Sequence, residues 1–236
     1  EDLLIAGLSY DARTDYIYAE TPDAGALGGP LTGAGVNNYD GTTGALIKRF
    51  DFGDGLVIKD LLVTNKAVYA TDSLSPTLYK IPLEHGGQPS SDWETITLDG
   101  FGMIDGTFNA NGLVGDFDGN ELVVVNRASG ILFHVDTESG AATEISVEGD
   151  QSTFPTGDGL FMRGRTLYIM QNQFGTGLPG KIAVVQLSGD LTRGTFVKDI
   201  TSDDFVTPTT IIGHGDSIYA VNSQAGAAIV GDPSEV

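Results

Sequence analysis

Short apolar runs alternate with turn residues along the whole chain, and they recur in a fixed order. Most copies open with Gly-Leu, pass through a turn and continue into a second apolar run; the copies are 7–20, 55–72, 112–126, 159–172 and 209–222. In later runs such as TLYKI and TEISV, apolar and polar residues alternate with a period of two, which is typical of half-buried strands. The pattern therefore predicts many short antiparallel strands rather than long helices.

A third and a fourth run follow most of these pairs, separated by turns rich in Asp, Asn, Ser and Gly. Four antiparallel strands in roughly fifty residues are the sequence signature of a β-propeller. We predict an all-β fold with a single propeller domain over 1–236, in which the blades have four antiparallel strands and lie at about 1–53, 54–110, 111–156, 157–206 and, in part, 207–236. A β-sandwich is the alternative, and the regular spacing of the repeats argues against it.

The partial blade at 207–236 bears on how the ring closes. A propeller hides the edges of its blades by closing on itself, so an incomplete last blade is completed by strands from the other end of the chain. Such strands are not present in this sequence. We therefore expect six blades in the intact protein, with the first blade missing here.

Composition narrows the classes of partner. The 236 residues are 40% apolar, with 33 glycines, and 32 acidic against 12 basic residues give a net charge of −20. Such a surface repels phosphate backbones and anionic lipid, so we predict neither a nucleic acid nor a membrane partner. The chain has no Cys, which excludes disulfides, a thiolate nucleophile and a Cys-based zinc site. No apolar stretch approaches the length of a membrane span.

A polar residue stands directly before Gly-Leu in two copies, as Asn111 in NANGLV and Asp158 in TGDGLF. The inner strands of a propeller line a central channel and start at the same end, so residues at these starts meet around one axis. The candidates from four successive blades are Asp54 or Lys59–Asp60, Asn111, Asp158 and Thr207–Thr209. Two interpretations remain open for Asn111 and Asp158: part of an oxygen shell for a cation such as Ca²⁺, or caps that tie turns to the backbone.

The loop FGMIDGTF at 101–108 is unusually apolar and leads to Asn111. It either folds between blades as core or forms one wall of a pocket, with Phe108 nearest to the channel. The glycine-rich stretch 174–181 has the spacing of a dinucleotide site, but a strand-like run follows it instead of a helix. It therefore predicts a long hairpin.

Four segments together resemble the six-bladed propellers of the senescence marker protein/gluconolactonase family, most of all its secreted-type members: NANGLV, TGDGLFMRGRTLYIMQN, FVTPTTI and IKDLLVTNKAVYATDS. The resemblance runs over nearly the whole chain and implies an extracellular protein. It also implies a divalent metal, often calcium, held by a first-blade Glu, an Asn before Gly-Leu and an Asp before Gly; the last two match Asn111 and Asp158. The metal would polarise a lactone carbonyl, and Asp158 would serve as general base for water.

Two features depart from that family. Its metal-binding Glu belongs to a first-blade segment that we do not find in this sequence. Lys59–Asp60 stand where the family has Asn-Asp, and a lysine there places a positive charge near the cation site. Lys59 would weaken metal binding, pair with Asp60 or Asp158, or hold an anionic ligand.

Two functional hypotheses follow. The first is a metal-dependent hydrolase of lactones or related small esters, in which Asn111 and Asp158 bind the metal and Lys59, Asp60 and Phe108 line the substrate pocket. The second is a non-catalytic propeller with a vestigial metal site that contacts a protein or glycan partner. Since folds are widely reused, the site must decide between them.

Overall fold

The structure is a computed structural model, and it describes residues 4–223 of the chain. Nineteen strands and one short 3-10 helix, η1 (Ala24–Leu27), make up its regular structure, which confirms the predicted all-β class. Within the described residues, no helix is long and apolar enough to cross a membrane.

The strands form five sheets that follow one another along the chain. The first holds β1 (Gly7–Asp11), β2 (Tyr16–Thr21), β3 (Ala34–Asp40) and β4 (Leu46–Gly53). The second holds β5 (Ile58–Val63), β6 (Ala67–Asp72), β7 (Thr77–Pro82) and β8 (Glu94–Thr97). The third holds β9 (Ala110–Gly115), β10 (Glu121–Asn126), β11 (Leu132–Asp136) and β12 (Ala142–Glu144).

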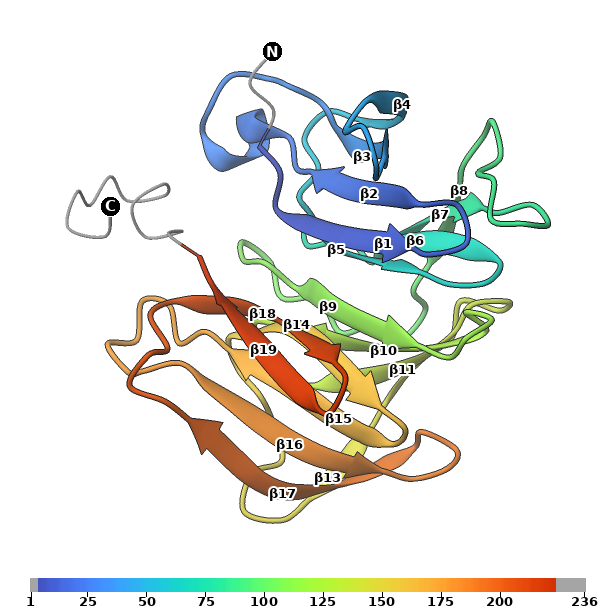
Figure 1. The fold of residues 1–236 in the computed structure, drawn as a ribbon. Helices are drawn as coiled ribbons and strands as arrows, with labels where there is room; N and C mark the ends of the chain where they lie inside the picture. The colour runs from blue at the N-terminus through green and yellow to red at the C-terminus, as the bar shows by residue number, and fades with distance from the viewer. Residues whose placement is uncertain (1–3, 224–236) are drawn as a thin grey trace.

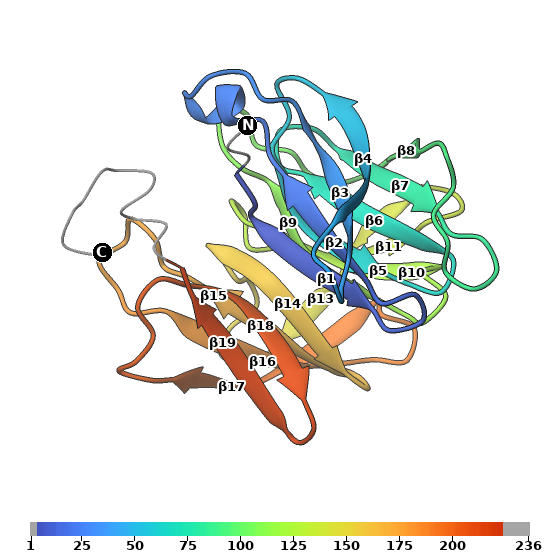
Figure 2. The same cartoon turned by 45° about the horizontal axis from the view of Figure 1, so that its top comes forward.

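The fourth sheet holds β14 (Gly157–Arg163), β15 (Thr166–Gln171), β16 (Lys181–Leu187), β17 (Arg193–Thr201) and the short β13 (Ser146–Glu148). The last sheet holds β18 (Pro208–His214) and β19 (Ser217–Asn222). Figures 1 and 2 show the sheets fanned from the blue β1–β4 to the red β18–β19. The first strands β1, β5, β9, β14 and β18 are neighbours in that order, so each sheet is a blade of a β-propeller.

One strand departs from the prediction. The run 142–149 lies within the predicted third blade, 111–156, and follows its third apolar run, so that prediction makes it the fourth strand of that blade. Instead, β12 ends at Glu144 and β13 pairs in parallel with β17 of the fourth sheet, which therefore has five strands. Ile145 and Val147 are both buried in the core between these two sheets, because the chain crosses from one sheet to the next at this point.

Apolar side chains fill the spaces between neighbouring blades. Along β10, Val123 and Val125 pack toward the fourth sheet, while Leu122 and Val124 pack toward the second. A strand that is buried on both faces needs a continuous apolar run, and this explains the unbroken pattern of LVVV.

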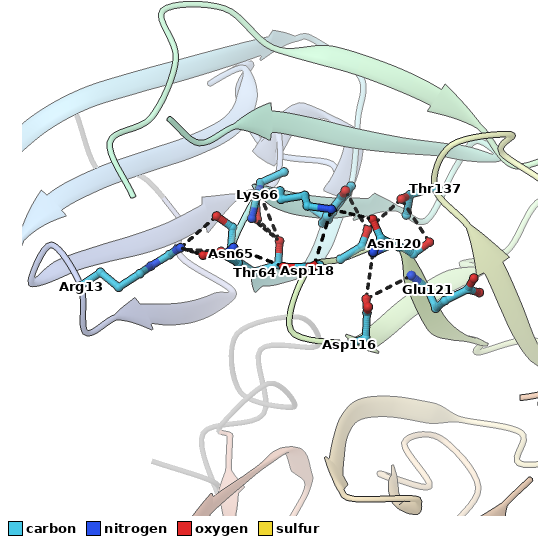
Figure 3. A network of polar contacts seen from close by, with 12 residues as sticks. Arg13, Thr64, Asn65, Lys66, Asp116, Asp118, Asn120, Glu121 and Thr137 are labelled. Atoms are coloured by element: carbon cyan, nitrogen blue, oxygen red, sulfur yellow. Dashed lines mark hydrogen bonds and ion pairs between the residues drawn. The ribbon is translucent and has the colours of Figure 1, made fainter. Parts of the chain in front are cut away.

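Turns tie successive blades together at the far end of the inner strands (Figure 3). Arg13 in the β1–β2 turn donates to the carbonyl oxygens of Thr64 and Asn65 at 2.6 and 2.9 Å. Asn65 in turn donates to Asp118, and Lys66 donates to Asn120 in the β9–β10 turn. The stretch 116–121 is therefore a turn in this network.

The two end blades differ from the middle ones. Leu8 and Tyr10 on β1 are 66% and 58% exposed, and Ile212 and Tyr219 in the last sheet are 60% and 53% exposed. By contrast, β9 is buried from Ala110 to Val114. The described residues thus form four blades and a two-stranded sheet with open outer faces, and closure into six blades stays a prediction.

Candidate functional site

The inner strands carry irregularities near their first residues. In β5, Ile58 pairs with Asp72 and Asp60 pairs with Thr71, so Lys59 has no partner across the ladder. This is a β-bulge, an extra residue that interrupts the pairing and re-aims a side chain. Lys59 therefore owes its position to the bulge rather than to the regular alternation of the strand.

The same irregularity recurs in the next three inner strands. The register shifts at Asn111–Gly112 in β9, at Asp158–Gly159 in β14 and at Thr209 in β18. Bulges are common beside active sites. Four successive blades thus place one irregular residue each at the same end of the channel.

The glycine after each polar residue allows neighbouring inner strands to come close. A Cβ atom added to Gly112 would collide with the carbonyl oxygen of Asp158, and one added to Gly159 would collide with Thr210. The following residues, Leu113 and Leu160, are buried in the cores between blades. In the repeated polar-Gly-Leu motif, the polar residue therefore lies at a bulge, the glycine allows a close contact between strands, and the leucine is a core residue.

Glu20 is a member of this region that sequence analysis missed. It lies near the end of β2 opposite Gly7, is fully buried, and neither of its carboxyl oxygens has a hydrogen-bond partner among the described residues. Burial raises the pKa of Glu20 well above its usual value, and the nearby carboxyl of Asp60 adds to the rise. A glutamate inside the strand YIYAET was the available signal, since Glu is almost never fully buried unless it is paired.

Asp60 joins two blades. Its carboxyl oxygens accept hydrogen bonds from the backbone N–H of Leu61 at 2.9 Å and of Leu113, on the next blade, at 3.0 Å. Burial raises the pKa of Asp60 to about 7, although these two hydrogen bonds act in the opposite direction. Asp60 therefore keeps its proton to a higher pH than an exposed aspartate does.

Asp158 is half-buried and accepts a hydrogen bond from the side-chain amide of Asn172 at 2.6 Å. Burial raises its pKa, while the charges of Lys59 and Arg127 and the amides of Asn172 and Asn111 partly offset the rise. Asn111 is only 1% exposed, and its Oδ1 has no partner in the described chain. Acceptor oxygens without donors thus accumulate around Asp158.

Lys59 and Phe108 form the side of the site nearer to the second blade. The Lys59 ammonium lies 4.9 Å from the centre of the Phe108 ring, a cation–π contact. Within residues 4–223, Lys59 makes no direct ion pair, although its positive charge acts to lower the pKa of Asp158. In the loop 101–108, Phe101 packs on Phe133 in the core, as one interpretation predicts, while Phe108 faces Lys59 and its place in a pocket wall stays a prediction.

Asn109, and not Asn111, ties a turn to the backbone, which was one of the two interpretations for Asn111. Asn109 accepts a hydrogen bond from the N–H of Ile104 at 2.7 Å and donates to the carbonyls of Ile104 and Thr107 at 3.0 and 2.9 Å, which fixes the loop. Over the described chain, the side chains of Asn111 and Asp158 make no hydrogen bond to backbone. Their polar atoms are therefore not used to hold turns.

The donor types suit a hard divalent cation. The carboxyl of Glu20 and the amide oxygen of Asn111 are buried without partners, and Asp158 lies beside them. Calcium prefers carboxylate and amide oxygens of this kind. Over residues 4–223, however, no three His, Cys, Asp or Glu side chains are gathered closely enough to hold a metal by themselves. A cation here would therefore need Asn111 and water in its shell, and the charge of Lys59 would lower its affinity.

Comparisons with known proteins bear on the fold. No protein-family profile matches the sequence, and no curated protein matches it significantly. The structure is similar to a "putative 6-phosphogluconolactonase" of Bacteroides fragilis, with 17% identity, a TM-score of 0.59 and coverage of 93% of this chain and 58% of the other. It is also similar to a second protein of that description from Bacteroides uniformis, with 15% identity, a TM-score of 0.60 and coverage of 92% and 64%.

A chain of a nidogen/laminin complex is similar as well, with 13% identity, a TM-score of 0.61 and coverage of 93% of this chain and 72% of the other. The chain spans less than two thirds of the length of the two Bacteroides proteins. At such low identity the likeness extends to the fold and no further. The comparisons therefore show that this protein has a β-propeller-type fold, and membership of the gluconolactonase family stays a prediction.

Proposed function

We propose that the channel end formed by Glu20, Asp60, Asn111 and Asp158 hydrolyses lactones or related small esters. The observation that carries the proposal is the fully buried, unpartnered carboxyl of Glu20 beside Asp158, since native proteins leave few buried polar groups without a partner unless they have a function. The names of the two Bacteroides fold neighbours point to the same chemistry.

Asp158 is the general base of the proposed reaction. Its Oδ2 is held by Asn172 at 2.6 Å, which leaves Oδ1 to accept a proton from water. A carboxyl whose pKa is raised by burial is a stronger base than an exposed one, and it stays ionised with help from Lys59 and Arg127. The water oxygen bonds to the lactone carbonyl carbon, the ring C–O bond breaks, and the proton held by Asp158 passes to the leaving alkoxide.

Glu20, Asn111 and Asp158 are the residues that would hold a divalent cation, and calcium suits their oxygen atoms best. When bound, such a cation would polarise the lactone carbonyl. Because Lys59 opposes its binding, we expect a weak site, in the range of about 10⁻⁴–10⁻³ M known for extracellular calcium modules.

The test is hydrolysis of a panel of γ- and δ-lactones, followed by acid release in a pH-stat with and without added calcium. Asp158→Asn should lower the rate by about 10²–10⁴-fold, because general-base catalysis contributes that much. Asp118→Asn is the matched control, since Asp118 lies in the exposed turn network at the other end of the inner strands. Equal rates in Asp158→Asn and wild type, or no hydrolysis by the wild type, would contradict the proposal and favour a non-catalytic binding propeller.

A further inference from the structure

Two positively charged side chains flank Asp158, and neither has an acidic partner of its own. Lys59 comes from the bulge of β5, and Arg127 directly follows β10. Within the described residues neither one forms an ion pair. Most of the twelve Lys and Arg residues make no ion pair in the described chain, so the distinguishing feature of Lys59 and Arg127 is that both act on the same carboxyl, that of Asp158.

Lys59 is positioned from both sides. Its strand is fixed to the next blade through Asp60, which accepts the N–H of Leu113, and its ammonium rests on the ring of Phe108 at 4.9 Å. The aromatic contact orients the ammonium but does not neutralise its charge. The Lys59 charge also acts on the carboxyls of Glu20 and Asp158, and burial raises the pKa of both of these groups. A half-buried ammonium interacts strongly with a nearby anion, because its surroundings screen it less than water does.

Arg127 reaches the same place from the third blade. Its guanidinium donates to Oδ1 of Asn172 at 3.5 Å, and Asn172 donates to Asp158 at 2.6 Å. The backbone of Arg127 is held as well, because its N–H donates to the carbonyl of Asn109 at 2.8 Å. Both cations hold down the pKa of Asp158 against the effect of burial, which places both within electrostatic range of the catalytic carboxyl.

We propose that Lys59 and Arg127 hold an anionic substituent of the substrate, so that the site selects acidic lactones or esters over neutral ones. The inference rests on the proposed function and adds the substrate class. The cations lie beside Asp158 while the chain as a whole carries −20, so the anion is selected at the site and not by long-range attraction. Lys59 is the main specificity residue because its ammonium lies on the Phe108 ring and makes no direct ion pair in the described chain, whereas the Arg127 guanidinium already donates to Asn172.

The first experiment uses two lactones that differ only in charge. These are γ-butyrolactone-γ-carboxylate and the corresponding carboxamide, which have the same ring and the same reacting carbonyl. The wild type should show a kcat/KM about 10- to 100-fold higher for the carboxylate, the range expected for hydrogen bonds to a charged group. Lys59→Met, which keeps length and removes charge, should reduce the ratio of the two values several-fold, while Arg127 retains a smaller preference for the carboxylate.

Lys48→Met is the matched control. The Lys48 ammonium also lies over an aromatic ring, that of Phe50 at 4.5 Å, but on the outer strand β4. This variant should keep the wild-type ratio. A wild type without preference for the carboxylate, or a Lys59→Met variant that lowers both kcat/KM values in parallel, would overturn the inference.

A binding measurement separates this inference from the proposed function. Tetrahydrofuran-2-carboxylate and tetrahydrofuran-2-carboxamide have no lactone carbonyl and cannot be hydrolysed. In titration calorimetry the carboxylate should bind the wild type at least about 10-fold more tightly than the carboxamide, and Lys59→Met should reduce the difference several-fold. If this holds while no lactone is hydrolysed, the anion site stands and the hydrolase proposal fails. Equal binding of both probes, or no binding of the carboxylate, overturns the anion site.

Discussion

Two buried carboxyls in the first blade, three residues apart, have opposite surroundings. Asp23 is fully buried, and its oxygens accept backbone hydrogen bonds from Gly25 at 3.0 Å, Thr32 at 2.9 Å and Gly55 at 2.7 Å. Glu20 is equally buried and accepts none within the described residues. Backbone donors lower the pKa of Asp23 to about 2, whereas burial raises that of Glu20.

The difference shows how a buried carboxyl that stabilises the fold can be distinguished from one that is available to bind a ligand. Asp23 begins the η1 turn and joins it to the loop before β5, so all of its bonds are internal. Glu20 destabilises the fold unless a proton, a cation or a substrate group compensates its charge. Burial alone does not distinguish the two residues, but hydrogen-bond satisfaction does.

The largest effect on stability should come from the satisfied carboxyl. Asp23→Asn replaces one acceptor oxygen by a donor that faces backbone N–H groups, so the unfolding midpoint in urea should fall clearly. Glu20→Gln removes a buried carboxyl without partners, and its midpoint should stay the same or rise. A loss of stability in Glu20→Gln as large as that in Asp23→Asn would break the comparison.

Calcium should act on the other carboxyl. At ten times its dissociation constant, calcium should stabilise the wild type by about 1.4 kcal/mol through binding linkage. We expect Asp23→Asn to keep this increment and Glu20→Gln to lose it, as measured by thermal unfolding with and without calcium. An increment that persists in Glu20→Gln would mean that the cation binds elsewhere.

The smallest expected effect concerns how the free energy of unfolding falls at acid pH. The pKa of Asp23 is about 2 in the folded chain and about 3.9 in an unfolded one, so its contribution is present above pH 4 and is lost as the pH falls towards 2. Asp23→Asn should flatten this acid limb. Glu20→Gln should leave the limb below about pH 3.5 unchanged, because Glu20 is protonated there both in the folded chain and in the unfolded chain, where its pKa is about 4.3. Unfolding free energies measured from about pH 2 to pH 3.5 test both expectations.

The sequence was sufficient for the parts of the structure that depend on local pattern. The repeated apolar runs predicted the strands and blades, because each strand between blades must be apolar on both faces, and the polar-Gly-Leu motif located Asn111 and Asp158. That Asn111 and Asp158 lie close to each other near the propeller axis follows from this topology. Lys59 and Phe108 were placed in the same region for the same reason.

What the sequence could not supply depends on contacts between distant segments. Asp60 accepts a hydrogen bond from the N–H of Leu113, fifty-three positions away, whereas Glu20 has no hydrogen-bond donor among the described residues. No local sequence pattern shows this difference. The crossing of the chain at Ile145 into the fourth sheet was missed because its alternation continues unbroken across the break. The sequence likewise does not show that Asn109 holds the loop while Asn111 keeps a free oxygen atom. This difference depends on the positions of the loop carbonyls, to which Asn109 donates.

The bulges of the inner strands have a consequence for how such a protein changes over time. Lys59 and Thr209 are surplus to the ladder, and Asn111 and Asp158 lie where the register is already broken. A substitution at one of these positions alters the chemistry of the channel end without moving the strand pairs that carry the core. The specificity of the channel end can therefore change by single substitutions at these four positions, while the strand pairs stay in place.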